Sequence, residues 1–321
     1  MRPTLLLSVL LLFPASAQEP KTSRPEPAPK KKAQLMPPKD VVFVEDKEYC
    51  DHGKFKLQLD LAYPKEGKGP FPAVVVIHGT GPGAKGRKNN VPLVWKLAQT
   101  GYVGVTISFR HKPEHAFPGA IEDVKCAVRW LRSHAEEYKI DPERVGALGF
   151  SGGGTLACLL GMCTAKDGME GNGGHANQSS RAQAVVCYFG PCDLGQLHDD
   201  CCKGRVGILA ALFLRPQLEQ WLGGPPNKVK ERYTKASPIN YVHKDAAPLL
   251  LLHGSADTVV PLAHSQLMAE KIRGKGAHVT FLTFADAPHD FDEQNDTNSR
   301  LAALAVMGFL DEHLKQKPNK R

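Results

Sequence analysis

The chain has 321 residues, a formal net charge of +8 and 42% hydrophobic residues. The positive charge belongs to the ends: residues 1–17 carry +1, residues 18–40 carry +3 and residues 315–321 carry +4, which leaves residues 41–314 neutral. A neutral central region argues against a nucleic-acid groove, and its length is compatible with one α/β domain.

The first residues have the pattern of a cleavable export signal. A basic start is followed by an apolar run at residues 5–13 and by small residues at 15–17. This run is shorter than the roughly 20 apolar residues that a membrane span needs. We therefore expect a signal peptide at 1–17, no integral membrane span, and a secreted or periplasmic protein. Residues 18–40 are rich in proline and lysine, which predicts a disordered tether, and residues 315–321 are expected to form a basic flexible tail.

The chain has eight cysteines, and in an exported protein this number permits disulfides. The sequence leaves their pairing open. No CxxC pair stands near a pair of histidines at ligand spacing, so we expect no bound metal.

Residues 41–314 alternate between strand and helix patterns. Residues 55–61 alternate apolar and polar side chains, as in a strand near a sheet edge. Nearly continuous apolar runs, typical of strands buried on both faces, occur at 72–78, 102–109, 144–150, 183–189 and 248–253. Helical patterns occur at 91–99, 118–137, 152–162, 262–274 and 298–314. This order predicts an α/β fold with a mostly parallel sheet and helices on both faces. Its binding crevice should lie beyond the carboxyl ends of the strands.

Residues 149–153 (GFSGG) match the G-x-S-x-G motif. This chemistry requires a strand-to-helix turn so tight that the nucleophile is strained and only small residues fit beside it. A bare match also arises by chance as a glycine-rich turn. Here a predicted strand precedes the motif and a predicted helix follows it, which favours Ser151 as a nucleophile.

A serine hydroxyl needs a base to take its proton and a carboxylate to orient that base. On this kind of fold the order along the chain is serine, acid, histidine. Asp257 follows the run 248–253, where it either orients a histidine or caps a turn. His289 follows a predicted strand at 279–284. The order favours His289 as the general base and Asp257 as its partner.

The oxyanion formed during attack on a carbonyl needs preorganised N–H donors. The backbone N–H of Gly152 is one candidate. The second is expected from the glycine-rich loop 78–83 (HGTGPG), with Gly79 and Thr80 as candidates. A phosphate-binding loop is the other interpretation of this segment, but no GK[ST] follows it.

The chain resembles the acetyl esterase and lipase group of α/β hydrolases, especially the branch with bifunctional xylan deacetylases and feruloyl esterases. The resemblance rests on several ordered segments, namely 109–118, 120–132, 141–145, 189–194, 236–239, HGSADTVVP and APHDF. It implies a triad of Ser151, Asp257 and His289, no cofactor, and carboxylic esters as substrates. Two positions depart from the pattern. Thr80 stands in a loop that is commonly HGGG, and Gly152 stands where an alanine after the serine is common.

The favoured function is therefore a secreted serine carboxylesterase acting on a small ester or an esterified polysaccharide, with acetyl or feruloyl groups as the expected acyl groups. Two alternatives remain: a peptidase of the prolyl-oligopeptidase kind, and a non-catalytic binding protein on a hydrolase fold. Substrate choice is expected to lie in loops at 110–119, 163–181 and 194–235.

Overall fold

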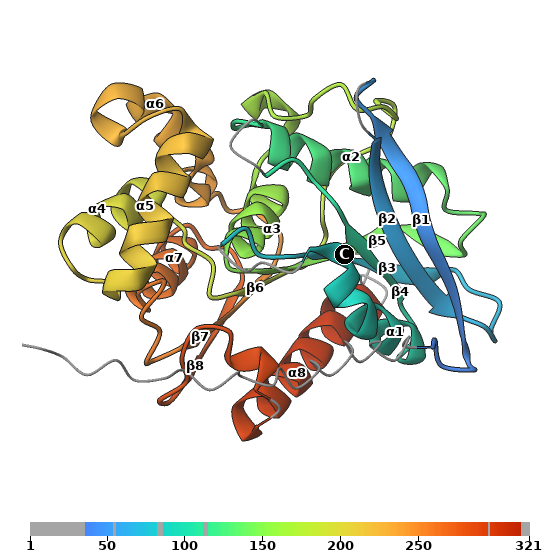
Figure 1. Ribbon diagram of the computed structural model, residues 1–321. Helices are drawn as coiled ribbons and strands as arrows, with labels where there is room; N and C mark the ends of the chain where they lie inside the picture. Colours follow the sequence, from blue (N-terminus) through green and yellow to red (C-terminus); the bar gives the residue numbers. More distant parts are fainter. Residues whose placement is uncertain (1–35, 54–55, 82–85, 112–114, 295, 316–321) are drawn as a thin grey trace, which may run out of the picture. The chain divides into compact units, whose positions relative to one another are not determined.

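The computed structural model separates the chain into two units, Met1–Met36 and Pro37–Arg321, and the second contains all the elements below (Figure 1). The residues that the structure describes are 36–53, 56–81, 86–111, 115–294 and 296–315. The predicted signal peptide, most of the predicted tether and residues 316–321 of the predicted tail lie outside this part of the chain, and they stay predictions.

An eight-stranded sheet forms the centre of the described unit, in the order β1-β2-β4-β3-β5-β6-β7-β8. The pairs β1–β2 and β2–β4 are antiparallel, and all the remaining pairs are parallel. The strands are β1 Val41–Asp51, β2 Lys56–Pro64, β3 Phe71–Ile77, β4 Val103–Ile107, β5 Ile140–Phe150, β6 Val185–Tyr188, β7 Leu249–Gly254 and β8 Val279–Phe284. The parallel part places the carboxyl ends of β3 and β5 to β8 along one edge.

The central strands are buried on both faces, and β3 shows why a continuous apolar run is needed there. Its odd-numbered side chains join one hydrophobic core and its even-numbered side chains join the other, as the two-residue period of a strand dictates. Helices α2, α3 and α7 contribute to the first core, and α1 and α8 contribute to the second. These helices are α1 Val91–Gln99, α2 Gly119–Ser133, α3 Gly152–Met162, α7 Ala263–Gly274 and α8 Thr297–Leu310.

The predicted α/β fold is confirmed. The segment predicted to lie near the sheet edge forms β2, next to the edge strand β1, which the sequence did not indicate. Residues 194–235, expected as loops, form three helices grouped together in Figure 1: α4 Leu194–Cys202, α5 Ile208–Leu222 and α6 Pro226–Ala236. In α5, apolar residues occupy both faces and Pro216 interrupts the interior, so the segment shows no amphipathic period.

All eight cysteines lie within the described residues and are free thiols. No helix in this part of the chain is both long enough and apolar enough to cross a membrane.

Candidate active site

Ser151 occupies the turn between β5 and α3 with φ 51° and ψ −123°. A non-glycine residue at this φ is strained by about 1–3 kcal/mol and persists only where its surroundings enforce it. The surroundings here are packed backbone. A Cβ added to Gly149 would lie 2.1 Å from the Gly153 carbonyl oxygen, and one added to Gly153 would lie 2.3 Å from the Ile77 carbonyl oxygen. The glycines of the motif are therefore required by close approach of the backbone.

The structure brings the three predicted triad residues together from the ends of three strands. The Ser151 hydroxyl lies 3.2 Å from His289 Nε2, and His289 Nδ1 lies 2.7 Å from Asp257 Oδ2. Because a carboxylate only accepts, Nδ1–H donates to Asp257 and leaves Nε2 free to accept the serine proton. The ring of Phe189 packs against His289 at 4.4 Å between centroids. This arrangement has the geometry of a serine nucleophile with its base.

Asp257 carries out both of the roles that the sequence left open. Its Oδ1 accepts hydrogen bonds from the backbone N–H groups of Val259 and Val260, at 2.8 and 2.9 Å, while its Oδ2 faces His289. Burial opposes its ionisation, but hydrogen bonds from His253 and His289 outweigh this and hold the pKa of Asp257 well below its usual range. A fixed anion therefore stands behind the His289 ring.

His253 is a second histidine on the same carboxylate, and the sequence analysis assigned it no role. Its side chain is fully buried, and Nε2 lies 3.1 Å from Asp257 Oδ2 and 2.9 Å from the Val260 carbonyl oxygen. Both of these atoms are acceptors, so Nε2 carries the proton, and Nδ1 accepts from the Ser265 hydroxyl at 2.8 Å. The signal available in the sequence was its place at the end of a buried strand, four residues before Asp257.

The loop after β3 lies against the turn that holds Ser151. The Nδ1–H of His78 donates to the Gly79 carbonyl at 2.8 Å, and its ring stacks on Phe109 at 4.4 Å. Burial lowers the pKa of His78 to about 4, so the ring is neutral at pH 7. From α5, Gln217 donates a hydrogen bond to the Thr80 carbonyl. These contacts fix the candidate oxyanion loop from both sides.

Two pockets of opposite character meet at Ser151. The narrow pocket, a cavity of about 60 Å³, includes Ser151, Gly152 and Thr80. Its apolar walls come from Leu156, Leu194, Leu197, Leu214, Leu218 and Trp221. The wide pocket, of about 460 Å³, includes Ser151 and His289. Its lining combines apolar side chains of α5 with the polar side chains of Asn89, Asn90, Asp290, Asp292 and Glu293.

Helix α5 supplies the walls of both pockets, which makes it the main element of the site that the sequence analysis missed. Its inward side places Leu214, Leu218 and Trp221 in the narrow pocket. Its first turns place Leu209 and Phe213 in the wide pocket, where these side chains are 73% and 56% exposed. The predicted specificity region 194–235 therefore does line the site, through helices α4 and α5.

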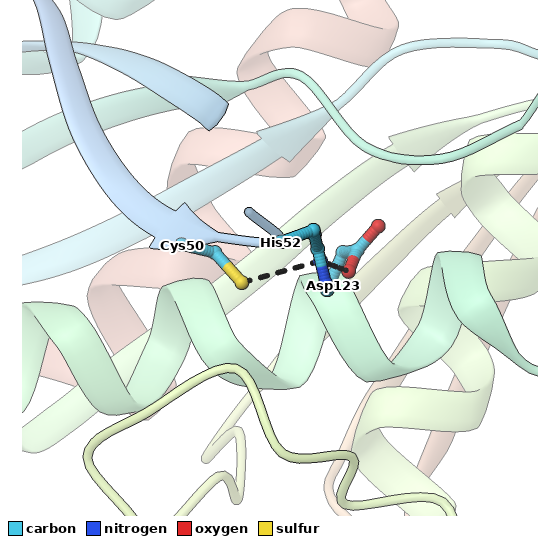
Figure 2. Close-up of side chains that lie close together, drawn as sticks. All are labelled: Cys50, His52 and Asp123. Atoms are coloured by element: carbon cyan, nitrogen blue, oxygen red, sulfur yellow. Dashed lines mark hydrogen bonds and ion pairs between the residues drawn. The ribbon is translucent and has the colours of Figure 1, made fainter. Parts of the chain in front are cut away.

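A separate cluster between β1 and α2 has the geometry of a metal site (Figure 2). His52 Nε2 lies 3.3 Å from Cys50 Sγ and 3.1 Å from Asp123 Oδ1. The same Oδ1 also accepts from Arg110 Nε and Nη2 at 3.0 and 2.8 Å. Because a cation bound here would face the Arg110 guanidinium, we assign the cluster to linking β1, α2 and the loop after β4.

The fold and the site are those of the α/β-hydrolase esterases. Residues 59–272 match the BD-FAE family of bifunctional acetyl xylan esterases and feruloyl esterases, and the chain belongs to this family. Among curated proteins, the probable carboxylic ester hydrolase LipM of Mycobacterium tuberculosis is 29% identical over 222 residues, which are 69% of this chain and 49% of LipM. Esterase LipQ of the same organism is 29% identical over 235 residues, which are 70% and 51% of the two chains. The chain thus spans about half the length of these relatives.

Solved structures are similar over most of the chain. A truncated carbohydrate esterase from gut microbiota superposes with a TM-score of 0.72 and 26% identity, covering 87% of this chain and 99% of that one. Esterase Est2 of Thermogutta terrifontis, with propionate bound, has a TM-score of 0.69 at 24% identity, covering 85% and 96% of the two chains. The latter likeness concerns the fold.

Proposed function

We propose that this protein is an exported serine carboxylesterase that removes short acyl groups from carbohydrate. Ser151 Oγ attacks the ester carbonyl while His289 Nε2 takes its proton. The same nitrogen then donates that proton to the leaving alcohol, and water releases the acid from the acyl-enzyme by the same route. Asp257 holds the ring and stabilises the imidazolium. The backbone N–H of Gly152 donates a hydrogen bond to the oxyanion, and the backbone N–H of Gly79 or Thr80 donates a second one. No cofactor enters these steps.

The observation that carries this proposal is the position of the triad between two unlike pockets. The leaving oxygen must come within hydrogen-bond reach of the group that protonates it. His289 lines the wide pocket and is absent from the walls of the narrow one among the described residues. The alcohol therefore lies in the wide pocket and the acyl group in the narrow one.

The walls of the wide pocket suit a carbohydrate as this alcohol. A sugar ring has apolar C–H faces and a rim of hydroxyl groups. Phe213 and Leu209 give the pocket apolar lining, and Asn89 and Asp290 give it hydrogen-bond donors and acceptors. The volume of about 460 Å³ is large enough for a sugar unit.

The size of the narrow pocket favours one of the two acyl groups that the sequence left open. The narrow pocket has a volume of about 60 Å³, against about 460 Å³ for the wide one. This difference favours a short acyl tail, such as acetyl, propionyl or butyryl, over the larger feruloyl tail. The family name covers both activities, and the size of the pocket supports the acetyl one.

Export is the remaining part of the proposal, and it is supported by the signal-like pattern of residues 1–17. N-terminal sequencing of protein recovered outside the cytoplasm tests it. A chain that begins near Gln18 is the expected result, and a retained Met1 contradicts it.

Hydrolysis assays test the enzyme proposal. Purified protein is given acetylated xylan, methyl ferulate, a prolyl peptide and p-nitrophenyl acetate, with Ser151→Ala as a parallel sample. We expect release of acetate from xylan and from the aryl ester by the wild type alone. Ser133→Ala, a change on an exposed serine at the end of α2, is the matched control and should keep full activity. Peptide cleavage, or no turnover of any ester, contradicts the proposal.

A further inference from the structure

The side chain of Thr80 lies directly against Gly152, the residue after the nucleophile. A Cβ added to Gly152 would lie only 2.0 Å from Thr80 Oγ1, and 3.1 and 3.2 Å from the Thr80 Cβ and Cγ2 atoms. The hydroxyl therefore occupies the space into which an alanine side chain at position 152 would point. The two departures noted in the sequence are thus one structural feature.

Thr80 lies next to the reaction centre. Thr80, Ser151 and Gly152 all line the narrow pocket, where the acyl carbonyl is placed by the proposed function. The Thr80 carbonyl oxygen accepts a hydrogen bond from the Gln217 side chain, which fixes the Thr80 backbone. Its hydroxyl has no hydrogen-bond partner within the part of the chain that the structure describes. A half-buried donor without a partner is thus held beside the site of attack.

The position of this hydroxyl relative to Gly152 defines what it can reach. The Gly152 N–H and the missing Cβ are substituents of the same Cα atom. A carbonyl oxygen that accepts from this N–H therefore lies close to a hydroxyl that stands at the Cβ position. Hydrogen bonds to an ionised acceptor are about twice as strong as neutral ones, so such a contact strengthens as the oxyanion forms.

We propose that the Thr80 hydroxyl donates a hydrogen bond to the oxyanion, alongside the backbone N–H groups. The Ser151 Oγ–carbon bond forms, the carbonyl π electrons move to oxygen, and the serine proton passes to His289. Thr80 keeps its proton and shares it with the new O⁻. This inference rests on the proposed function.

Two substitutions at one position separate a donor from a space-filling side chain. Thr80→Val keeps the shape and loses the hydroxyl, and Thr80→Ser keeps the hydroxyl and loses a methyl group. Removing one oxyanion donor costs about 100-fold to 1,000-fold in kcat. We expect Thr80→Val to lower kcat for p-nitrophenyl acetate by about 100-fold with little change in KM, and Thr80→Ser to stay within a few-fold of the wild type.

A trifluoromethyl ketone, which forms a tetrahedral adduct with serine, gives a second readout. Its inhibition constant should weaken in Thr80→Val in parallel with kcat and be preserved in Thr80→Ser. Thermal unfolding of both variants confirms that they are folded. Wild-type kcat in Thr80→Val, or equal losses in both variants, overturns the inference and leaves the esterase proposal standing. A wild type that hydrolyses no ester overturns both.

The contact itself is tested at Gly152. Gly152→Ala should abolish activity, because its Cβ collides with the Thr80 hydroxyl. Adding Thr80→Gly removes the collision, so the double variant should recover the activity of Thr80→Gly alone. An active Gly152→Ala single variant, or a double variant as inactive as that single one, contradicts the packing on which the inference depends.

Discussion

The carboxyl edge of the sheet and helix α5 meet at Ser151, yet they are built by different rules. At the sheet edge, Ser151, Asp257 and His289 are fixed by strained backbone and by hydrogen bonds of 2.7 to 3.2 Å. Helix α5 contributes apolar side chains to the lining of the pockets. On its outer face, Ile208 and Leu212 are exposed. The difference separates two tasks. Under the proposed function, the sheet edge carries out the chemistry on any ester that reaches it, and α5 selects which esters reach it.

Asp257→Asn should have the largest effect of the substitutions considered below. An amide in place of the carboxylate favours the wrong tautomer of His289 and removes the charge that stabilises the imidazolium, which costs about 10⁴-fold in kcat. The loss should be equal for acetate and butyrate esters, because it acts on the sheet edge. Steady-state kinetics with both substrates measures it. A loss confined to one acyl group would show that the two tasks are not separate.

His253→Ala tests the support behind the triad and should have a smaller effect. It removes a hydrogen bond to a buried carboxylate, which stabilises the fold by about 1.5–3 kcal/mol, and it lowers kcat by about tenfold. His253→Gln, whose amide nitrogen reaches a similar position, should retain more of both. Urea unfolding gives the change in the free energy of unfolding, and steady-state kinetics on the same samples gives the change in kcat. Unchanged kcat in His253→Ala would remove His253 from the positioning of Asp257.

Trp221→Ala tests the other side of the comparison. Removing this side chain lengthens the narrow pocket, so kcat/KM for p-nitrophenyl octanoate should rise about tenfold relative to acetate. The kcat for acetate should change little, because the triad is untouched. Leu212→Ala, on the exposed side of α5, is the matched control and should leave the ratio unchanged. An unaltered preference in Trp221→Ala would mean that the acyl group does not occupy this pocket.

Asp292 gives the smallest expected effect on turnover, because its influence is on the pH dependence of stability. Burial raises the pKa of its carboxyl from the usual 3.8 to about 7, and the charges of Asp290 and Glu293 act in the same direction. The folded state therefore holds an extra proton between these values, and the free energy of unfolding falls as pH rises from about 4 to 7.

Asp292→Asn should remove this decline, so that it gains stability relative to the wild type as pH rises to 8. The measurement is urea unfolding at several pH values. Asp286→Asn makes the same chemical change on an exposed loop residue and should follow the wild type throughout. If the free energy of unfolding of the wild type depends on pH in the same way as that of Asp292→Asn, the raised pKa of Asp292 is contradicted.

The sequence predicted those features that depend on local pattern and chain order. Buried parallel strands leave continuous apolar runs, and the turn at Ser151 leaves glycines where the backbone has no room for a side chain. The order of Ser151, Asp257 and His289 then follows from the fold. Each of these features can be recognised in the sequence without knowledge of tertiary contacts.

The features that could not be predicted from the sequence depend on contacts between distant segments or on exposed apolar residues. Because apolar side chains such as Leu209 and Phe213 are exposed, α5 has no helical period of apolar residues. Pro216 inside the helix also argues against a helix when only the sequence is known. The pairing of Thr80 with Gly152 joins positions on two different strand ends. Pocket size and the place of the leaving alcohol required the folded arrangement.

The most direct test of the account is covalent labelling by paraoxon followed by peptide mass mapping. A serine activated by His289 and Asp257 should take up one phosphoryl group, on Ser151, and lose activity in step with labelling. Ser151→Ala should remain unlabelled. A label on another residue, or an active wild type that paraoxon neither labels nor inhibits, would contradict a nucleophilic Ser151 at the centre of this site.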